Sequence, residues 1–480
     1  MTTPSFEPTD RERDQENSAF AAEISQGFGS FGIVPVDTAV ASQSGTAQLR
    51  RTRRRRLDDP VGIMTLVDED GVLRWRIGSG PAPRRPAGRR ARRGAGSRGR
   101  IVEQFKFEDL PANQIGAKLR DLDGYLTRTQ GLFHVPKAAL EVLDRQRRGD
   151  ASQKLTLDEE VQPPKQGRVL LLVHGTFSSC ENLLTELASS DEGFDLLREV
   201  LNGPTYDQVL AFNHPTLSVS PILNAATLAS RFRGSDPQVD VICHSRGGLV
   251  TRWWLEVVDH FQGEARGSVV FAGSPLAGTG LASPHQLKGA LDVLTNLSRA
   301  LSLAAKAGGI LFPIAAPLGH AVGVLFSMFG KITSIAAKTP LLDAGVAMIP
   351  GLAGQSREGA NGEILRLREA FTRRPAAERQ ERFLDRYWFL TSNFETEDAG
   401  WRFWRHFRKA NLADAATDRV FEGENDLVVD SVSMTDLADG TRAAGGQTHG
   451  FGTSSLVHHC NYFQQEATVE LLRRALRVDG

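Results

Sequence analysis

The chain has 480 residues, with 57 Lys and Arg against 57 Asp and Glu, so its net charge points to no particular partner. This length is enough to bury at least one large core and by itself suggests two or three domains. Three cysteines, an odd and small number, imply no disulfide framework. The N-terminus has neither a basic start nor an apolar stretch, so we expect no secretory signal and a cytoplasmic protein.

Positive charge is concentrated near the N-terminus. Residues 1–100 hold 18 Arg, no Lys and 12 acidic residues, a net charge of +6, and most of the arginines lie in residues 49–56 and 84–100. Such runs, mixed with Gly, Pro and Ser, bury too little apolar surface to become ordered. We expect a disordered Arg-rich tail over residues 1–58 and a disordered segment over about 79–100.

The arginine runs raise the question of a partner. An anionic membrane surface is one candidate, which would make the protein peripheral at the membrane. Nucleic acid is disfavoured because the runs have almost no aromatic residues between the arginines. A solvated tail that binds neither remains open.

Between these runs and the linker "DEEVQPPKQG", residues 59–150 are expected to form a small N-terminal module. The stretch "IMTLVDEDGVLRWRI" alternates around Asp70–Gly71, which predicts a β-hairpin. A further strand is expected in "IVEQFKFEDL", and residues 114–147 are expected to be mostly helical.

From about residue 160 the pattern changes. "RVLLLVHGTF" starts with a continuous apolar run, typical of a strand buried on both faces of a parallel sheet. Similar runs follow in "QVLAFNH", "VDVICHS", "SVVFAGSP" and "RYWFLTSNF", with helical segments between most of them. This alternation predicts an α/β fold with a doubly wound, mostly parallel sheet over residues 160–480.

One insertion, at about residues 283–355, interrupts this rhythm. Residues 307–330 carry no formal charge, and three interpretations are open: a helical lid or cap over an apolar pocket, a buried helical pair, or a membrane span. We favour the lid, because a single crossing would separate Ser245 from the acid and base proposed below. No transmembrane span is therefore expected.

The stretch "VDVICHSRGGLV" predicts a strand that turns sharply into a helix, with Ser245 at the corner. A serine needs a base to become a nucleophile, and such a turn exposes its hydroxyl beside the backbone N–H groups of the helix start. The residues two before and two after the serine must be small. Gly247 fits, and Cys243 is expected to occupy the same kind of small-residue position.

A second strand end, "VHGTF", is expected to face the same site. The backbone N–H groups of Thr176 and Arg246 would together form an oxyanion hole, while His174 would order the loop. The glycine-rich stretch "AGSPLAGTG" at residues 272–280 would frame the pocket.

The base is sought among the late histidines of "SSLVHHCNYF". We prefer His459 because Tyr462 and Phe463 can anchor its loop, with His458 as the alternative and His449 as a weaker third candidate. A partial metal site at the two adjacent histidines is disfavoured, because no matching ligand cluster is evident elsewhere.

The acid should lie on a loop between the serine and the histidine. Asp426, inside "ENDLVV" of the stretch "VFEGENDLVVDSVSM", has apolar residues on both sides to hold it at a strand end. Asp430 and Asp418 are the alternatives.

These motifs resemble those of the α/β-hydrolase superfamily, and within it the microbial triacylglycerol lipases and glycosylphosphatidylinositol inositol-deacylase-like proteins. The resemblance covers about residues 160–480 and implies Ser245, His459 and Asp426 as nucleophile, base and acid, with no metal or organic cofactor. The sequence departs from the family pattern at Cys243 and Leu427, where the family often has Gly.

The implied function is hydrolysis of an apolar acyl ester through an acyl-enzyme. Two rivals stay open. One is a serine hydrolase of another class, such as a peptidase or thioesterase, because the three residues do not select the leaving group. The other is a degenerate hydrolase fold that serves as a binding module through its arginine tract.

Overall fold

The protein is described from a computed structural model. The described residues are 10–36, 61–77, 99–108, 114–150, 152–258, 267–283, 286–308, 313–335, 349–357, 361–397, 401, 403, 420–421, 423–438, 440–441 and 445–478. Asp418, most of both arginine runs, and residues 1–9 lie outside them.

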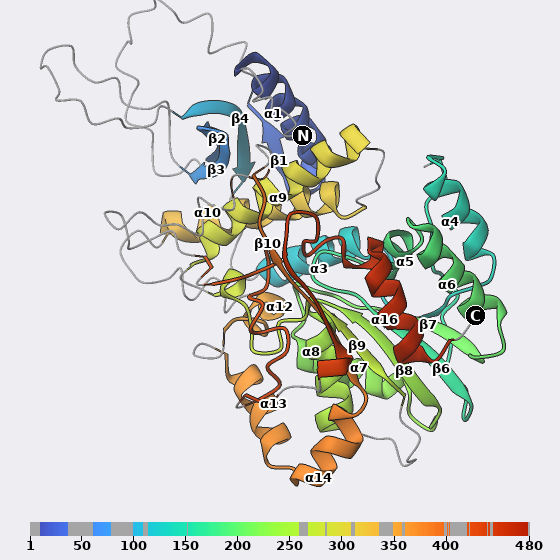
Figure 1. The fold of residues 1–480 in the computed structure, drawn as a ribbon. Coiled ribbons are helices and arrows are strands. Elements are labelled where there is room, and N and C mark those ends of the chain that lie inside the picture. The colour runs from blue at the N-terminus through green and yellow to red at the C-terminus, as the bar shows by residue number, and fades with distance from the viewer. Residues whose placement is uncertain are drawn as a thin grey trace, which may run out of the picture.

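A seven-stranded sheet forms the centre of the molecule (Figure 1). Its order is β11-β10-β9-β8-β6-β7-β5, and every neighbouring pair is parallel except β5 with β7. All five strands expected from the apolar runs are present. The strands are β5 (Gly131–His134), β6 (Arg168–Val173), β7 (Gln208–Asn213), β8 (Gln238–His244), β9 (Val269–Ala272), β10 (Tyr387–Phe394) and β11 (Thr448–Ser454).

Helices cover both faces of this sheet. On β6, Leu170 and Leu172 pack into a cluster with helices on one face of the sheet, whereas Val169 and Leu171 pack into a second cluster with helices on the other face. Successive residues of a strand point to opposite faces, so the continuous apolar run serves both layers. This is an α/β fold with a doubly wound, mostly parallel sheet, as expected.

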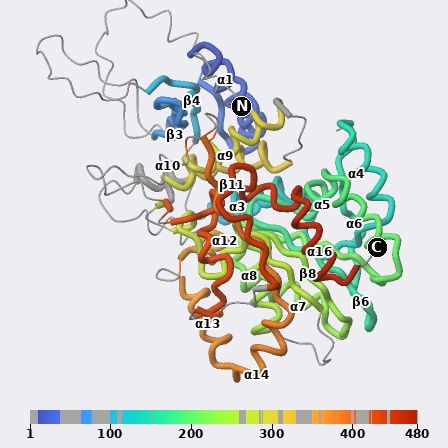
Figure 2. Tube along the Cα trace, in the orientation of Figure 1, coloured from blue at the N-terminus to red at the C-terminus, as the bar shows by residue number. Residues whose placement is uncertain are grey.

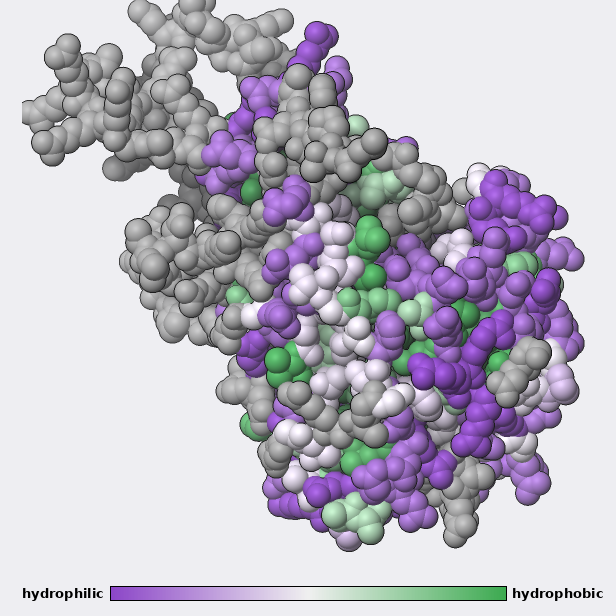
Figure 3. Space-filling model, viewed as in Figure 1, coloured by the Kyte–Doolittle hydropathy of each residue, from purple (hydrophilic) through white to green (hydrophobic). Residues whose placement is uncertain are grey.

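The helices around this sheet have the following bounds: α3 (Ile115–Leu126), α4 (Ala139–Arg147), α5 (Cys180–Leu187), α6 (Asp191–Asn202), α7 (Pro221–Arg231), α8 (Gly247–Arg252), α12 (Pro350–Ala353), α13 (Gly362–Thr372), α14 (Ala376–Arg379) and α16 (Glu466–Leu476). A π-helical turn, Trp253–Val258, extends α8. In Figure 3, hydrophilic residues cover the region of α4, α6 and α16, as amphipathic surface helices require.

A second, four-stranded sheet lies at the N-terminal end. It consists of β1 (Ile33–Pro35), β2 (Val61–Glu69), β3 (Val72–Ile77) and β4 (Arg100–Glu108), in the antiparallel order β1-β4-β2-β3. The predicted hairpin is confirmed, with Asp70 and Gly71 at φ values of +56° and +89°. Such values are typical of a tight hairpin turn.

The expectation of a disordered tail over residues 1–58 does not hold for residues 10–36. They form α1 (Asp10–Ser25), the 3-10 helix η1 (Phe28–Phe31) and β1. α1 packs through Phe20 and Ile24 into the same core as the small sheet. The sequence did not predict this helix because its three buried apolar residues, Phe20, Ala21 and Ile24, stand among charged residues and give no helical hydrophobic pattern. The helix is ordered by packing against the rest of the protein.

The boundary expected between the N-terminal module and the rest also needs correction. β5, inside the range assigned to that module, is an edge strand of the central sheet, paired antiparallel with β7. The stretch expected to be mostly helical therefore splits into α3, β5 and α4. β5 and α4 therefore belong with the central sheet, whereas α3 packs through Leu119 and Leu122 into the same core as α10 and the small sheet.

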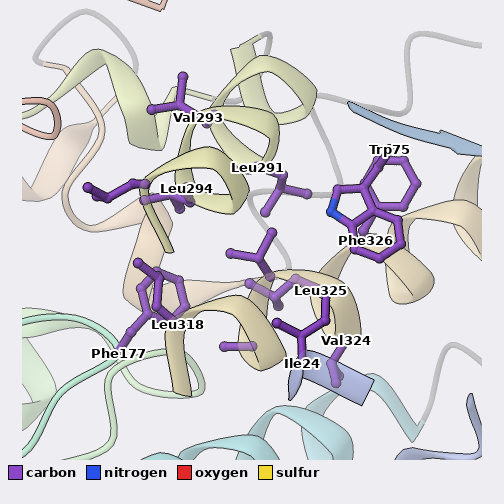
Figure 4. Packing of buried hydrophobic residues seen from close by; sticks show 14 of the residues in the cluster. Ile24, Trp75, Phe177, Leu291, Val293, Leu294, Leu318, Val324, Leu325 and Phe326 are labelled. Carbon is purple, nitrogen blue, oxygen red and sulfur yellow. The ribbon is translucent and has the colours of Figure 1, made fainter. Parts of the chain in front are cut away.

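The insertion forms a long helical pair, α9 (Leu287–Gly308) and α10 (Ala315–Ile335), between the central sheet and the small sheet (Figures 1 and 2). Figure 4 shows Leu291, Leu294 and Leu318 of this pair together with Phe177, and Phe326 beside Trp75 of β3. α10 is apolar because it is packed on several sides. None of the helices in the described part of the chain is long and apolar enough to cross a membrane.

Candidate active site

Ser245 occupies the predicted corner between β8 and α8. Its φ is +52°, a left-handed value that non-glycine residues adopt rarely and that commonly marks a functional site. The turn is held by the Ser245 N–H, which donates to the Ala272 carbonyl at 2.8 Å, and by the Gly248 N–H, which donates to the Ser245 carbonyl at 2.9 Å. The side chain is therefore fixed at the carboxyl end of the sheet.

The small residues around the turn meet a steric need. A Cβ on Gly247 would lie 2.4 Å from the Val173 carbonyl oxygen, so no larger residue fits without movement of β6. Cys243 is fully buried, and its thiol donates to the Val270 carbonyl of β9 at 3.3 Å. The cysteine thus fills its position and bonds to the neighbouring strand.

His459 and Asp426 form a buried hydrogen-bonded pair. The His459 Nδ1 lies 2.8 Å from Asp426 Oδ2, and the His459 N–H donates to the Asp426 carbonyl at 2.9 Å. Asp426 Oδ1 accepts from the backbone N–H groups of Val428 and Val429 at 3.1 and 2.8 Å. These contacts hold the carboxylate in place and orient the imidazole through its Nδ1, and no described residue is bonded to its Nε2.

Tyr462 is a member of this site that the sequence suggested only as a loop anchor. Its hydroxyl donates to Asp426 Oδ2 at 2.9 Å, so this oxygen holds both Tyr462 and His459. Burial, followed by the nearby charge of Asp426, raises the pKa of Tyr462 well above its usual range. The phenol therefore stays a donor.

The other candidates for acid and base lie elsewhere. The His458 ring packs against Phe394 and Trp401, and its Nδ1 accepts from the Cys460 N–H at 3.2 Å. Burial lowers its pKa to about 3. His449 lies on β11, where its ring contacts Phe451. Asp430 forms an ion pair with Arg357 at 2.5 Å.

Leu427, one of the two positions where the sequence departs from the motif that it resembles, has an unusual backbone conformation. Its φ is +84°, a conformation that favours glycine. Here the turn is held by the Leu427 N–H, which donates to Asn425 Oδ1 at 3.0 Å, and the leucine side chain is fully buried. Apolar burial offsets the backbone strain.

The loop after β9 approaches the Asp–His pair closely. Gly273 has a φ of +53°, and a Cβ there would lie 2.6 Å from the Tyr462 ring, 3.0 Å from Asp426 Oδ2 and 3.2 Å from His459 Nδ1. The predicted glycine-rich loop therefore frames the acid and base directly. No larger side chain fits at this position.

The loop after β6 lies against the serine. A Cβ on Gly175 would be 2.7 Å from Ser245 Cβ, and Thr176 lines the same cavity as Ser245. His174 orders this loop: its Nε2 accepts from the His214 N–H at 3.1 Å, so its Nδ1–H donates to the Gly175 carbonyl at 2.9 Å. Burial lowers the pKa of His174 to about 3, which keeps it neutral.

His244, the residue before the serine, has a similar structural role. Its Nε2 donates to the His459 carbonyl at 2.9 Å. Burial lowers its pKa to about 3, with the neighbouring His459 adding to the effect. His244 thereby ties the serine turn to the loop of His459.

The Arg246 side chain contributes more than the sequence suggested, since only its backbone N–H was expected to matter. It is fully buried and donates from Nη2 to the Val219 carbonyl at 2.6 Å. Burial lowers its pKa to about 10, against the attraction of Asp123 and Glu363. Asp123 in turn accepts from the N–H groups of residues 216–218, so this loop packs onto the serine turn.

An apolar cavity of about 60 Å³ connects these residues. Ser245, His459 and Thr176 line it on the side of the sheet, and leucines of α9 and α10 line it opposite. The leucines are Leu291, Leu294, Leu297 and Leu318. The described residues contain no group of three His, Cys, Asp or Glu side chains that could hold a metal ion.

Comparisons with known proteins give a family and several similar structures. Residues 137–477 match a family described as "Domain of unknown function (DUF7379)". No curated protein matches the sequence. The mature lipase BlEst2 of Bacillus licheniformis is 16% identical, with a TM-score of 0.34, and the match covers 66% of this chain and 94% of that chain.

Two further similar structures are lipase 1 from Pelosinus fermentans and phospholipase PlaB from Legionella pneumophila. The first is 12% identical with a TM-score of 0.34, covering 65% of this chain and 97% of that chain. The second is 13% identical with a TM-score of 0.32, covering 56% of this chain and 45% of that chain. These values are too low to carry an activity over to this chain.

Proposed function

This chain belongs to the family described as domain of unknown function DUF7379, and we propose that it is a serine hydrolase that cleaves apolar acyl esters. One observation carries the proposal. Ser245 and His459 line the same apolar cavity, and Asp426 is bonded to the far nitrogen of His459. A serine turned into a cavity beside an oriented imidazole is the arrangement that nucleophilic catalysis needs.

In the proposed reaction, His459 Nε2 takes the hydroxyl proton as Ser245 Oγ bonds to the ester carbonyl carbon. The tetrahedral intermediate collapses when His459 gives this proton to the leaving alcohol, which breaks the ester C–O bond. Water then attacks the acyl-enzyme by the same route and releases the acid. Asp426 holds the tautomer that makes both transfers work.

The backbone N–H groups of Thr176 and Arg246 are the proposed oxyanion donors. Among the described residues neither of them donates to a protein acceptor, so both are available. Arg246 immediately follows the serine at the start of α8, and Thr176 lies on the loop that packs against it. Such preorganised donors stabilise negative charge that develops only in the transition state.

The lining of the cavity supports an apolar acyl group as substrate. The cavity has a volume of about 60 Å³, and one buried water needs roughly 10–15 Å³, so the cavity has room for only a few waters. A long acyl chain therefore requires α9 and α10 to move away from Ser245. We propose that this helical pair is a lid, seen here in its closed position.

The arginine runs fit a peripheral membrane role for the same protein, which we place in the cytoplasm. Residues 49–56 lie between β1 and β2, and residues 84–99 lie between β3 and β4. Both connections thus belong to the small sheet that packs on the proposed lid. Attraction to anionic lipid is worth about 1 kcal/mol for each basic residue near the surface.

The proposed activity is tested by labelling with a fluorophosphonate probe, followed by peptide mass spectrometry to locate the adduct. We expect an adduct on Ser245 that is absent from Ser245→Ala. A panel of esters of increasing chain length, a thioester and a peptide amide then identifies the substrate class. No labelling of the wild type, with or without detergent, would overturn the proposal.

The membrane role is tested separately by co-sedimentation with vesicles. We expect binding to vesicles with anionic lipid, a decrease with salt, and no binding to purely zwitterionic vesicles. Replacing the arginines of residues 51–56 by glutamine should weaken binding. Retention on nucleic acid in preference to vesicles would contradict this assignment.

A further inference from the structure

The Thr176 side chain is bonded to a residue that sequence motifs do not mark. Gln355 lies two residues after the end of α12, at the end of the proposed lid insertion, and lines the same cavity as Ser245. Its side-chain amide contacts Thr176 Oγ1 through Nε2 at 2.9 Å and through Oε1 at 3.1 Å. We propose that Gln355 is a positioning residue that holds the oxyanion loop, an inference that rests on the proposed hydrolase function.

Gln355 is itself held rigidly. It is 4% exposed, and its Nε2 also donates to the Gly351 carbonyl at 2.8 Å. Its backbone N–H donates to the Leu352 carbonyl at 3.0 Å. A group with this many bonds has lost its rotamer freedom before substrate arrives, as a positioning residue must.

The same residue reaches the acid loop through a continuous series of hydrogen bonds. The Thr279 N–H donates to the Gln355 carbonyl at 2.9 Å, and Thr279 Oγ1 donates to the Val428 carbonyl at 2.5 Å. The Val428 N–H then donates to Asp426 Oδ1 at 3.1 Å. Gln355 therefore connects the loop of Thr176 with the acid that orients His459.

The chemical consequence concerns the transition state. An N–H donor to an oxyanion works only if it already points to where the charge will develop. The next residue, Phe177, has a φ of +60°, so the loop is strained and needs external support. Loss of the Gln355 contact frees Thr176 to shift, and a misplacement of about 1 Å costs up to roughly 100-fold in rate.

The test is a double-mutant cycle on Thr176→Val and Gln355→Met in the full chain. Both changes keep size and remove the bond, and Thr176→Val retains the backbone N–H. We expect each single variant to lower kcat for a short-chain ester by roughly 10- to 100-fold, with KM changed less than threefold. The double variant should be no worse than the poorer single variant, and Thr176→Ser should restore most of the activity.

A matched control separates positioning from general stability. Gln146 is another buried glutamine that bonds a threonine, Thr185 Oγ1 at 3.2 Å, and neither lines the cavity of Ser245. Gln146→Met should lower the free energy of unfolding by an amount similar to that of Gln355→Met and leave kcat unchanged.

Each outcome decides between the two proposals. If the wild type reacts and Gln355→Met has wild-type kcat, or if the two losses simply multiply, the positioning role is overturned while the hydrolase stands. A rise in KM alone would overturn it as well, because it would make Gln355 a substrate contact. No reaction of the wild type with probe or ester would overturn both.

Discussion

The Tyr462 hydroxyl lies 2.9 Å from Asp426 Oδ2, the same oxygen that holds His459 Nδ1 at 2.8 Å. Asp426 is therefore bonded both to His459 and to Tyr462, which lies three positions after His459 in the sequence. Because the 3-10 helix η10 (Tyr462–Gln464) places the phenol, the turn after His459 fixes both the base and its partner. The Asp426–His459 pair forms because the short segment from His459 to Tyr462 packs against the loop of Asp426.

Tyr462→Phe keeps the ring and removes this donor. A hydrogen bond to a charged group contributes about 1.5–3 kcal/mol, so we expect kcat to fall by roughly 10-fold or more. KM should change little, because the tyrosine is not among the residues that line the cavity. Steady-state kinetics on a short-chain ester measure both, and an unchanged kcat would show that the Asp426 carboxylate does not need the donor from Tyr462.

The two adjacent histidines offer an internal comparison. His459→Ala should lower kcat by a factor of about 10³ or more, because no other group takes the serine proton. His458→Asn keeps an acceptor for the Cys460 N–H, so it should cost stability and retain most of the activity. The reverse ranking in the same assay would make His458 the base.

Gly273→Ala tests the packing of the loop against the Asp–His pair. The new methyl group would meet the Tyr462 ring at 2.6 Å, so we expect loss of activity and of Ser245 labelling. Gly440 is the matched control, since its φ of +75° imposes similar strain but a Cβ there meets nothing within 4 Å. Gly440→Ala should cost about 1 kcal/mol of stability and no activity. Equal effects of the two variants would exclude a steric role for Gly273.

Acid should destabilise the protein through its buried histidines. Burial lowers the pKa of His174, His244 and His458 from the ordinary 6.5 to about 3, so the unfolded chain binds more protons between these values. The free energy of unfolding is therefore unaffected by the titration of these histidines at neutral pH. It decreases as pH falls below 6.5, by about 1.4 kcal/mol per pH unit for each histidine.

The measurement is urea unfolding at pH 7.5 and pH 5.5. In His174→Gln, where Gln can still accept from the His214 N–H, the decrease in unfolding free energy between these values should be smaller by about 1.4 kcal/mol. A decrease equal to that of the wild type would mean that His174 is protonated in the folded state.

A substitution of Trp75 tests whether the small sheet and the helical pair α9–α10 unfold as one unit. Its N–H donates to Asp292 Oδ1 at 2.9 Å, and its Nε1–H donates to Thr295 Oγ1 at 2.8 Å, both on α9. Trp75→Ala should lower the free energy of unfolding by about 3–5 kcal/mol in a single transition. Two separate transitions in the wild type would show that the small sheet unfolds by itself.

Local sequence patterns predicted five of the seven strands of the central sheet and the main candidate residues of the site. The strands of "RVLLLV" and "VDVICH" were readable because a buried parallel strand is apolar on both faces. Ser245 could be proposed from the sequence because its turn tolerates only small neighbours. Asp426 could be proposed because it lies in the short motif "ENDLVV". Each of these signals depends on residues adjacent in sequence.

The tertiary structure decided the rest. β11, "THGFGTS", is largely polar and becomes a strand only through pairing with β10. α1 is ordered because Ile24 and Phe28, which follows it, fit against Gly319 and Gly323 of α10. The sequence left His458 and His459 open, and the bond of His459 to Asp426 distinguishes them.

Gln355 and Tyr462 show the same division. The sequence did not mark Gln355 and suggested Tyr462 only as a loop anchor, and each is bonded to a partner that lies 179 or 36 positions away. Hydrophobic periodicity and turn chemistry are properties of neighbouring residues, so the sequence by itself determined the fold class and pointed to Ser245 as the proposed nucleophile. Hydrogen bonds between distant segments exist only after the chain has packed, so only the tertiary structure determined which side chains hold that serine's partners in place.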